Sequence, residues 1–131
     1  MPYINTPVVA NLVYNFVWHT KSKSPILIGH VKRRAHELLR EACSYNKIAV
    51  LGGNVGTTHV YMQLSCPARL APSEIMRLIK GRSSRYLQSE FPSVTKTLSG
   101  ESFWNEGYYC QTVGEDCEAA IRKYIGRDDG L

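Results

Sequence analysis

The sequence predicts an α+β fold, in which helices pack on a single antiparallel sheet and the element order is βαββαβα. Two patterns predict it. Apolar and polar residues alternate along several short segments, as they do in half-buried strands. Between these segments, apolar residues recur at spacings of three and four, as they do in amphipathic helices. This order is typical of the ferredoxin-like and RNA-recognition-motif class.

The first predicted strand runs from Leu12 to His19, because its large apolar side chains share one face: Leu12, Tyr14, Phe16 and Trp18. The other face carries polar side chains: Asn11, Asn15 and His19. A polar segment over residues 20–25 ends this strand. The first helix is then predicted over Gly29 to Tyr45, where apolar residues repeat at helical spacing: Val31, Ala35, Leu38, Leu39 and Ala42.

The second and third strands follow. An apolar run from Ile48 to Leu51 predicts a strand at the centre of the sheet, and the glycines at 52, 53 and 56 predict a turn or bulge after it. The stretch 57–64 alternates again and predicts a strand that ends near Pro67. Its apolar residues would face the core, so His59 and Tyr61 would share the opposite, wetter face. An imidazole and a phenol there are ordinary surface residues unless other parts of a site accompany them.

The second helix is predicted from about Pro72 to Phe91, because proline and the acidic Glu74 suit a first helical turn. Residues 93–102 are predicted to form a loop, and the last strand is expected from Tyr108 to Val113. A final helix would open at residue 115 and end at Gly126. The 131 residues suffice for one hydrophobic core, so residues 1–131 are predicted to form a single domain.

Basic residues exceed acidic residues by 16 to 11, which gives a net charge of +5 and is compatible with a polyanionic partner. On the second helix, basic residues and small hydroxyl residues form one stripe: Arg77, Lys80, Arg82, Ser83, Ser84 and Arg85. A solvated helix face and a phosphate-binding stripe explain this pattern equally well. Four further cations lie near the first strand and helix: Lys21, Lys23, Lys32 and Arg33.

Cysteine spacing and hydropathy exclude several classes of protein. The four cysteines form no CxxC pair and no zinc-ligand pattern, so we expect reduced, inert thiols: Cys43, Cys66, Cys110 and Cys117. No apolar run approaches the ~20 residues of a membrane span. The N-terminus lacks the charged and apolar regions of a signal peptide. We therefore expect a cytoplasmic protein that does not bind membranes.

Three sequence blocks stand in a fixed order after the His59 strand. Lys-Gly-Arg-Ser-Ser spans residues 80–84, Phe-Trp-x-x-Gly-Tyr-Tyr spans 103–109, and Thr-Val-Gly at 112–114 precedes Arg-Lys-Tyr-Ile at 122–125. Together they resemble the small single-tyrosine transposases of the HUH superfamily, in the IS200/IS605 insertion-sequence family. Transposases associated with repetitive extragenic palindromes are relatives of that family. The resemblance covers residues 11–128.

The resemblance implies a homodimer that acts on hairpins of single-stranded DNA. Such an enzyme cuts one strand through a 5′-phosphotyrosine and rejoins it without hydrolysis, with the help of a divalent metal ion. By position, Tyr124 matches the nucleophile and His59 the first metal-binding histidine. In the family arrangement, His59 of one subunit would face Tyr124 of the other. The basic stripe and Lys21 would contact DNA, and Trp104 would stack on an unpaired base.

Three residues depart from the family pattern. Tyr61 stands at the second histidine position and would be a poor ligand, because its phenol is neutral at pH 7. Thr58 stands where an aspartate is usual, and Asp128 stands where a glutamine often completes the metal site. A carboxylate at Asp128 would favour Mg²⁺ or Mn²⁺.

Three functions remain open. The chain is either a single-strand transposase or a transposase-derived protein that binds DNA hairpins and is impaired in cleavage. A third and more distant alternative is an RNA-binding domain of similar fold, which would not use the Tyr124 helix. Helical spacing alone also allows Tyr124 to be a core aromatic residue.

Overall fold

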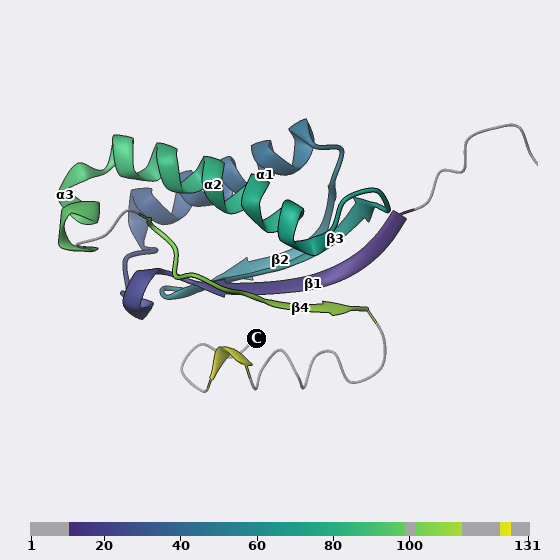
Figure 1. The fold of residues 1–131 in the computed structure, drawn as a ribbon. Helices are drawn as coiled ribbons and strands as arrows, with labels where there is room; N and C mark the ends of the chain where they lie inside the picture. The colour runs from purple at the N-terminus through teal and green to yellow at the C-terminus, as the bar shows by residue number, and fades with distance from the viewer. Residues whose placement is uncertain (1–10, 99–101, 114–123, 127–131) are drawn as a thin grey trace, which may run out of the picture.

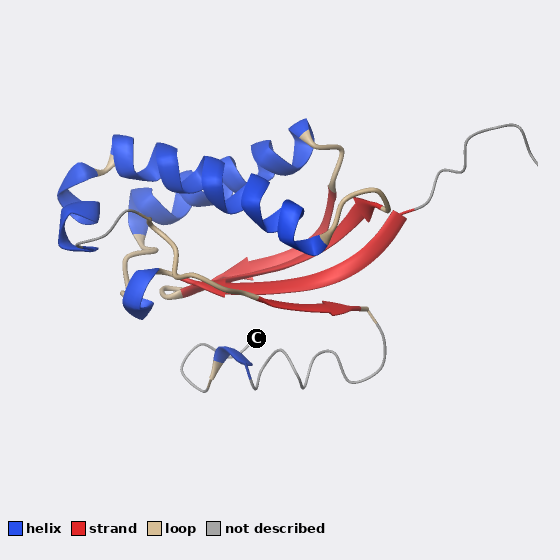
Figure 2. Ribbon diagram, viewed as in Figure 1, coloured by secondary structure: helices blue, strands red, loops and turns tan. Residues whose placement is uncertain are grey.

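A four-stranded antiparallel sheet with helices on one face forms the fold in a computed structural model of the chain (Figures 1 and 2). The structure describes residues 11–98, 102–113 and 124–126. Its strands are β1 (Asn11–His19), β2 (Ala49–Val55), β3 (His59–Pro67) and β4 (Tyr109–Thr112). Its helices are α1 (Gly29–Tyr45), α2 (Pro72–Glu90), the short α3 (Pro92–Thr95), and the 3-10 turns η1 (Lys21–Lys23) and η2 (Lys96–Leu98). The α+β class predicted from the sequence is confirmed.

The strand order β2-β3-β1-β4 places β1 and β3 at the centre of the sheet. These two strands pair along their whole length, from Asn11 opposite Pro67 to His19 opposite His59. The prediction that the Ile48–Leu51 run lies at the sheet centre is wrong, because β2 is an edge strand and the Leu51 side chain is 53% exposed. The run is apolar because α1 packs against part of it, not because strands flank it on both sides.

Of the predicted turn or bulge, the structure has the bulge: the glycines at 52 and 53 lie inside β2. Pairing with β3 shifts by one residue between Val50 and Gly52, which is a bulge. At Gly53, a Cβ atom would lie 2.4 Å from the backbone oxygen of Tyr61. The strand therefore needs glycine at position 53, because it allows a close approach to β3 that a larger residue would block.

Helices α1 and α2 cover one face of the sheet and enclose the main core (Figure 1). All five apolar residues predicted to face the core from the first helix are buried. On the sheet side, Phe16 and Trp18 of β1 are fully buried. Trp18 meets Trp104 edge to face, with ring centroids 5.9 Å apart. The alternation read from β1 thus predicted this face correctly.

The opposite face of the sheet is also buried where residues 124–126 lie against it (Figure 1). Ile125 packs on Val17 of β1, with Tyr61 and Tyr109 beside them. The predicted wetter face is therefore wrong for His59, which is fully buried, and Tyr61 is half-buried. A strand pattern shows which side chains share a face but not what later covers that face.

Helix ends agree closely with the sequence pattern. α1 spans the predicted residues, and α2 begins at Pro72, where Glu74 accepts a hydrogen bond from the backbone N–H of Ala71 (3.1 Å). The predicted 93–102 loop instead contains α3 and η2. Most of the predicted final helix lies outside the described residues, which include only 124–126 of it. Among the described residues, none of the helices is long and apolar enough to cross a membrane.

Candidate functional site

Two histidines from the central strands lie together on the sheet face opposite the helices. His19 ends β1 and His59 begins β3, and the two are direct partners in the antiparallel register. Cross-strand partners project their side chains to the same face. Their ring centroids lie 6.2 Å apart, and both side chains are buried. The alternating pattern of β1 places His19 on this face without indicating a role for it; only the strand register shows that His59 is its partner.

Gly56 sets the position of the His59 ring. The backbone N–H of Gly56 donates to the carbonyl oxygen of His59 (2.9 Å), which closes the β2–β3 connection. A Cβ atom at Gly56 would lie 2.4 Å from Cε1 of the His59 ring. That distance is far inside van der Waals contact, so only glycine leaves room for the imidazole where it lies.

Tyr124 lies on the same face as the histidines. Its ring centroid is 5.6 Å from that of His19 and 5.2 Å from that of Tyr109 in β4. The side chain is 40% exposed, and its partial burial raises the pKa of the phenol. The alternative that Tyr124 is a core aromatic residue does not fit this exposure. Within one chain, the predicted nucleophile thus lies next to His19, which in turn faces His59.

Tyr61 points into a polar cluster on the sheet. Its hydroxyl donates to Oδ1 of Asn15 (3.1 Å), and Nε2 of Gln63 donates to the same oxygen (3.1 Å). Asn15 is almost fully buried. The Tyr61 hydroxyl therefore satisfies the buried amide oxygen of Asn15. The sequence pattern did not indicate this structural role.

Asp128, the other predicted metal ligand, lies outside the described residues. The part of the chain that the structure describes holds no group of three or more His, Cys, Asp or Glu residues arranged around one point. His19 and His59 are the paired imidazoles on the Tyr124 face. They are the residue type that binds divalent transition metals.

Trp104 and Ser83, both predicted to contact DNA, are instead structural. Trp104 is buried, and its Nε1 donates to Oγ of Ser83 (2.9 Å). Ser83 is fully buried and donates to the carbonyl oxygen of Ile79 (2.8 Å). Trp104 therefore has no free face on which a base could stack. The predicted DNA contacts of these two residues are corrected: they join α2 to the segment before β4.

Ser84 and Lys80 have a partly structural role. Oγ of Ser84 accepts a hydrogen bond from the backbone N–H of Phe103 (2.9 Å). The Lys80 ammonium donates to the carbonyl oxygens of Asn105 and Gly107, each at 2.9 Å. Burial lowers the pKa of Lys80. The Lys-Gly-Arg-Ser-Ser block thus fastens the segment that leads into β4 onto α2.

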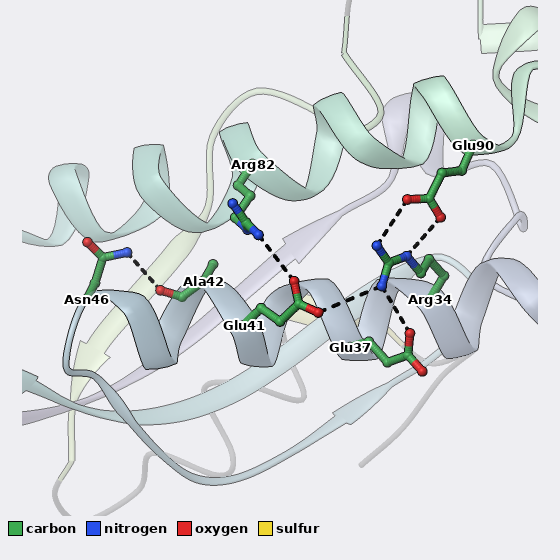
Figure 3. Close-up of polar contacts among 7 residues, drawn as sticks. All are labelled: Arg34, Glu37, Glu41, Ala42, Asn46, Arg82 and Glu90. Carbon is green, nitrogen blue, oxygen red and sulfur yellow. Dashed lines mark hydrogen bonds and ion pairs between the residues drawn. The ribbon is translucent and has the colours of Figure 1, made fainter.

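Arg82 belongs to a charge network between α1 and α2 (Figure 3). Its guanidinium lies 3.2 Å from Glu41 and rests over the rings of Tyr45 and Tyr86, at 4.7 and 5.0 Å from their centroids. Arg34 continues the network with a two-pronged contact to Glu90. Arg82 is thus held by helix packing, and its predicted contact with DNA would compete with Glu41.

Arg77 and Arg85 are exposed on α2, and Lys21 is half-exposed in η1. Arg85 borders a hollow of about 510 Å³ whose other lining residues are Lys80, Gly81, Ser84, Gln88 and Ser102. A larger groove of about 680 Å³ separates α1 from β2, with four basic or histidine side chains along its α1 wall: Lys32, Arg33, His36 and Arg40. Gln88, Ser102, His36 and Arg40 were not predicted, because only packing brings them to these hollows.

Comparison with known proteins shows the family of the chain. The family model described as "Transposase IS200 like" matches residues 8–128. The chain belongs to the IS200-like transposase family. It is 31% identical over 117 residues to the ISDra2 transposase TnpA of Deinococcus radiodurans, which covers 89% of this chain and 84% of that protein. It is 30% identical over 115 residues to the transposase for insertion sequence element IS200 of Salmonella typhimurium, covering 88% of this chain and 75% of that one.

Solved structures share the fold of this IS200-like chain. A candidate transposase from Deinococcus radiodurans R1 superposes with a TM-score of 0.84 at 25% identity, covering 99% of this chain and all of that one. A REP-associated tyrosine transposase bound to a REP hairpin has a TM-score of 0.58 at 10% identity, over 95% of this chain and 68% of that one. The second likeness concerns the fold alone.

Proposed function

We propose that this transposase binds a hairpin of single-stranded DNA, and cuts and rejoins one strand through a covalent intermediate on Tyr124. The position of Tyr124 carries the proposal. Its phenol is partly exposed, and its ring centroid lies 5.6 Å from that of His19, on the face that also holds His59. Membership of a transposase family supports it, because DNA transposition requires that a strand be cut and joined.

The chemistry follows from the properties of a phenol. The Tyr124 oxygen attacks the phosphorus of a DNA phosphodiester, and the bond from phosphorus to the 3′ oxygen breaks. The phenol proton passes to solvent, and the leaving oxygen takes up a proton to become a free 3′-OH. The new tyrosine ester keeps the energy of the broken bond, so a second 3′-OH can attack it and restore the phenol without ATP.

A divalent ion, Mg²⁺ or Mn²⁺, is part of the proposal. Such an ion would neutralise charge that develops on the phosphate oxygens. The residues fit it in part. His59 offers an imidazole on the correct face, whereas the hydroxyl of Tyr61 donates to Asn15. Asp128 is proposed as a further ligand.

The cations on the helices are proposed to bind the DNA backbone. Exposed Arg77 and Arg85, with Lys80 and Ser84 at the smaller hollow, suit phosphate oxygens. Helices α1 and α2 lie on the face of the sheet away from Tyr124 (Figure 1). A strand held by these cations must therefore pass round an edge of the sheet to reach the phenol, which a flexible single strand can do and a stiff duplex cannot.

The test of the function is covalent trapping. Labelled hairpin DNA incubated with the protein and Mn²⁺ should yield a protein–DNA species that survives denaturing electrophoresis, and Tyr124→Phe should yield none. Failure of the wild type to give an adduct with any hairpin, under conditions where it binds DNA, would contradict the proposal.

The second candidate is a DNA-hairpin-binding protein impaired in cleavage. The hydrogen bond from Tyr61 to Asn15 favours it, because it takes the residue at the second histidine position away from metal binding. This candidate predicts tight hairpin binding with no adduct in the wild type and an adduct in Tyr61→His. The two candidates thus differ in the wild-type lane of the same gel.

A homodimer is proposed for either candidate, with Tyr124 and His59 drawn from different subunits when DNA is bound. Light scattering at micromolar concentration measures the mass directly. A monomer with and without DNA would contradict the dimer, and it would leave the arrangement seen within one chain, with Tyr124 beside its own His19, as the working site.

A further inference from the structure

We propose that His19 and His59 together hold the divalent metal ion, so that β1 supplies the second imidazole that Tyr61 does not supply from β3. The inference rests on the proposed function in one respect, because it places the ion beside Tyr124. It assigns to His19 a role that the sequence motif does not contain. The ligand pair then spans two strands, where the sequence motif would place both ligands on β3.

The register brings the two rings to a suitable spacing. His19 and His59 are opposite each other at the ends of paired central strands, and their ring centroids are 6.2 Å apart. Imidazole nitrogens bind a metal ion at about 2.0–2.1 Å, so two rings sharing one ion have centroids about 5 to 6 Å apart. Small rotations of the two side chains would bring the 6.2 Å separation of the centroids into this range.

The backbone around both residues is fixed by hydrogen bonds outside the strand ladder. The N–H of Asn105 donates to the carbonyl oxygen of His19 (2.9 Å), and the N–H of Gly56 donates to that of His59 (2.9 Å). The N–H of Thr20 donates to the carbonyl oxygen of Thr58 (2.9 Å), which ties the two strand ends together. Ligands on rigid elements hold their geometry better than ligands on loops.

The neighbours of the pair suit a site for phosphodiester chemistry. Gly56 leaves the space that the His59 ring occupies, since a Cβ there would lie 2.4 Å from that ring. The centroid of the Tyr124 ring lies 5.6 Å from that of the His19 ring, and the Tyr124 side chain is partly exposed. An ion between the two histidines would therefore lie close to the phenol and to any phosphate that approaches it.

The pair also changes the expected choice of metal. Imidazole is a ligand of intermediate softness that suits Co²⁺, Ni²⁺ and Zn²⁺ and binds Mn²⁺ more weakly, whereas Mg²⁺ prefers oxygen ligands. A second imidazole from His19, added to that of His59, predicts that Mn²⁺ and Co²⁺ bind more tightly than Mg²⁺.

Metal binding can be measured without DNA and without activity. The protein freed of metal by chelator is titrated with Co²⁺, followed by visible absorption, and with Mn²⁺, followed by the electron paramagnetic resonance signal of the free ion. We expect one ion per chain in the wild type. Loss of one of two imidazoles in His19→Ala should weaken binding by about tenfold or more. His30→Ala, which removes an exposed histidine of α1, is the matched control and should bind as the wild type does.

Two further variants separate ligand loss from unfolding. His19→Gln keeps a polar side chain of similar reach and should also bind weakly. His19→Ala combined with Tyr61→His puts an imidazole back on the same face from β3, and it should recover most of the affinity. Recovery would show that the missing imidazole, and not damage to the fold, caused the loss.

Unchanged affinity in both His19 variants would overturn the inference, and so would a wild type that binds neither ion at millimolar concentration. Weaker binding in Tyr61→Phe with normal binding in His19→Ala would also overturn it, by making the phenol the ligand. The adduct test separates the two proposals. An adduct without metal binding to the pair would leave the proposed function standing and reject this inference. Metal binding by the pair without an adduct would support this inference and contradict the proposed function.

Discussion

Asn15 shows how one buried amide determines what its neighbours can do. Its Oδ1 accepts hydrogen bonds from the Tyr61 hydroxyl and from the Gln63 amide, each at 3.1 Å. A buried amide oxygen needs such donors, because an unsatisfied polar group in the interior costs about 1–3 kcal/mol. Tyr61 is therefore a structural donor in this chain, and the proposed metal site must draw its ligands from other residues.

Trp104→Phe tests whether the indole is structural. The change removes the donor to Ser83 and part of a buried ring that meets Trp18 edge to face. We expect the free energy of unfolding to fall by about 2 kcal/mol, measured by denaturant titration, while hairpin affinity below the transition stays unchanged. Affinity that falls sharply while stability is kept would restore Trp104 as a base-stacking residue.

Gly56→Ala tests the packing around His59. The added methyl would overlap the imidazole, so the ring must move or the β2–β3 connection must shift. We expect a loss of stability of about 1–3 kcal/mol and a clear shift of the His59 ring resonances in the NMR spectrum. Gly81→Ala is the control, because a Cβ at Gly81 meets no atom within 4 Å.

At the scale of elements, the contact between α1 and α2 combines apolar packing with a charge network. The α1 stripe and the α2 stripe meet over the sheet, and Arg34, Glu41, Arg82 and Glu90 link the outer sides of the two helices (Figure 3). The Glu90 and Glu37 carboxylates raise the pKa of Arg34. The cations that the sequence groups into one stripe thus divide into those that hold structural elements together, Lys80 and Arg82, and those that stay exposed, Arg77 and Arg85.

Arg34→Ala tests this network. The guanidinium contacts Glu90 through two nitrogens, at 2.8 and 3.0 Å. Because the pair is partly exposed, we expect a loss of only about 0.5–1 kcal/mol, and less at high salt. Thermal melts at low and high salt measure both effects. Arg33→Ala, an exposed neighbour on the same helix, should change stability by less; an equal loss would contradict the network.

Cys43, buried in α1, gives a prediction for pH. Burial raises the pKa of its thiol from 9.0 to about 12. Below about pH 9 both folded and unfolded states keep the proton. Above that pH the unfolded thiol ionises first, so stability should fall between about pH 9 and 12. Denaturant midpoints across this range should fall less steeply in Cys43→Ala than in the wild type. Equal slopes would show that the thiol does not contribute.

At the scale of the whole molecule, the sheet separates two surfaces. Helices α1 and α2 cover one face of the sheet (Figure 1). Tyr124 and the two histidines lie on the other face. The proposed function therefore expects the DNA substrate to contact both surfaces. In that proposal, the exposed cations bind the DNA backbone and a flexible strand reaches the Tyr124 phenol.

Hairpin binding should weaken steeply as salt rises, because each neutralised phosphate releases counterions. Arg85→Ala should lower the affinity and reduce the slope of log affinity against log salt by about 1. Arg69→Ala removes the same charge from an exposed position away from both hollows and should change neither. Anisotropy titrations at several salt concentrations measure both quantities. Equal effects of the two variants would mean that net charge, and not the hollow beside Arg85, binds the DNA.

Residue spacing by itself determined the α+β order, the extents of α1 and α2, and the faces of β1 and β3 that enter the core. Such features depend on neighbours within a few residues, which a sequence pattern records directly. The pattern also grouped His59 with Tyr61, since both lie on one strand.

Only the tertiary structure decided three matters. It made β2 an edge strand, it buried Trp104 and Ser83 against each other, and it brought His19 opposite His59 and beside Tyr124. Each of these depends on contacts between residues far apart in the chain, 40 positions in the case of the two histidines. Strand pairing and layer packing set such contacts, and local periodicity carries no record of which strand becomes a neighbour or what covers its outer face.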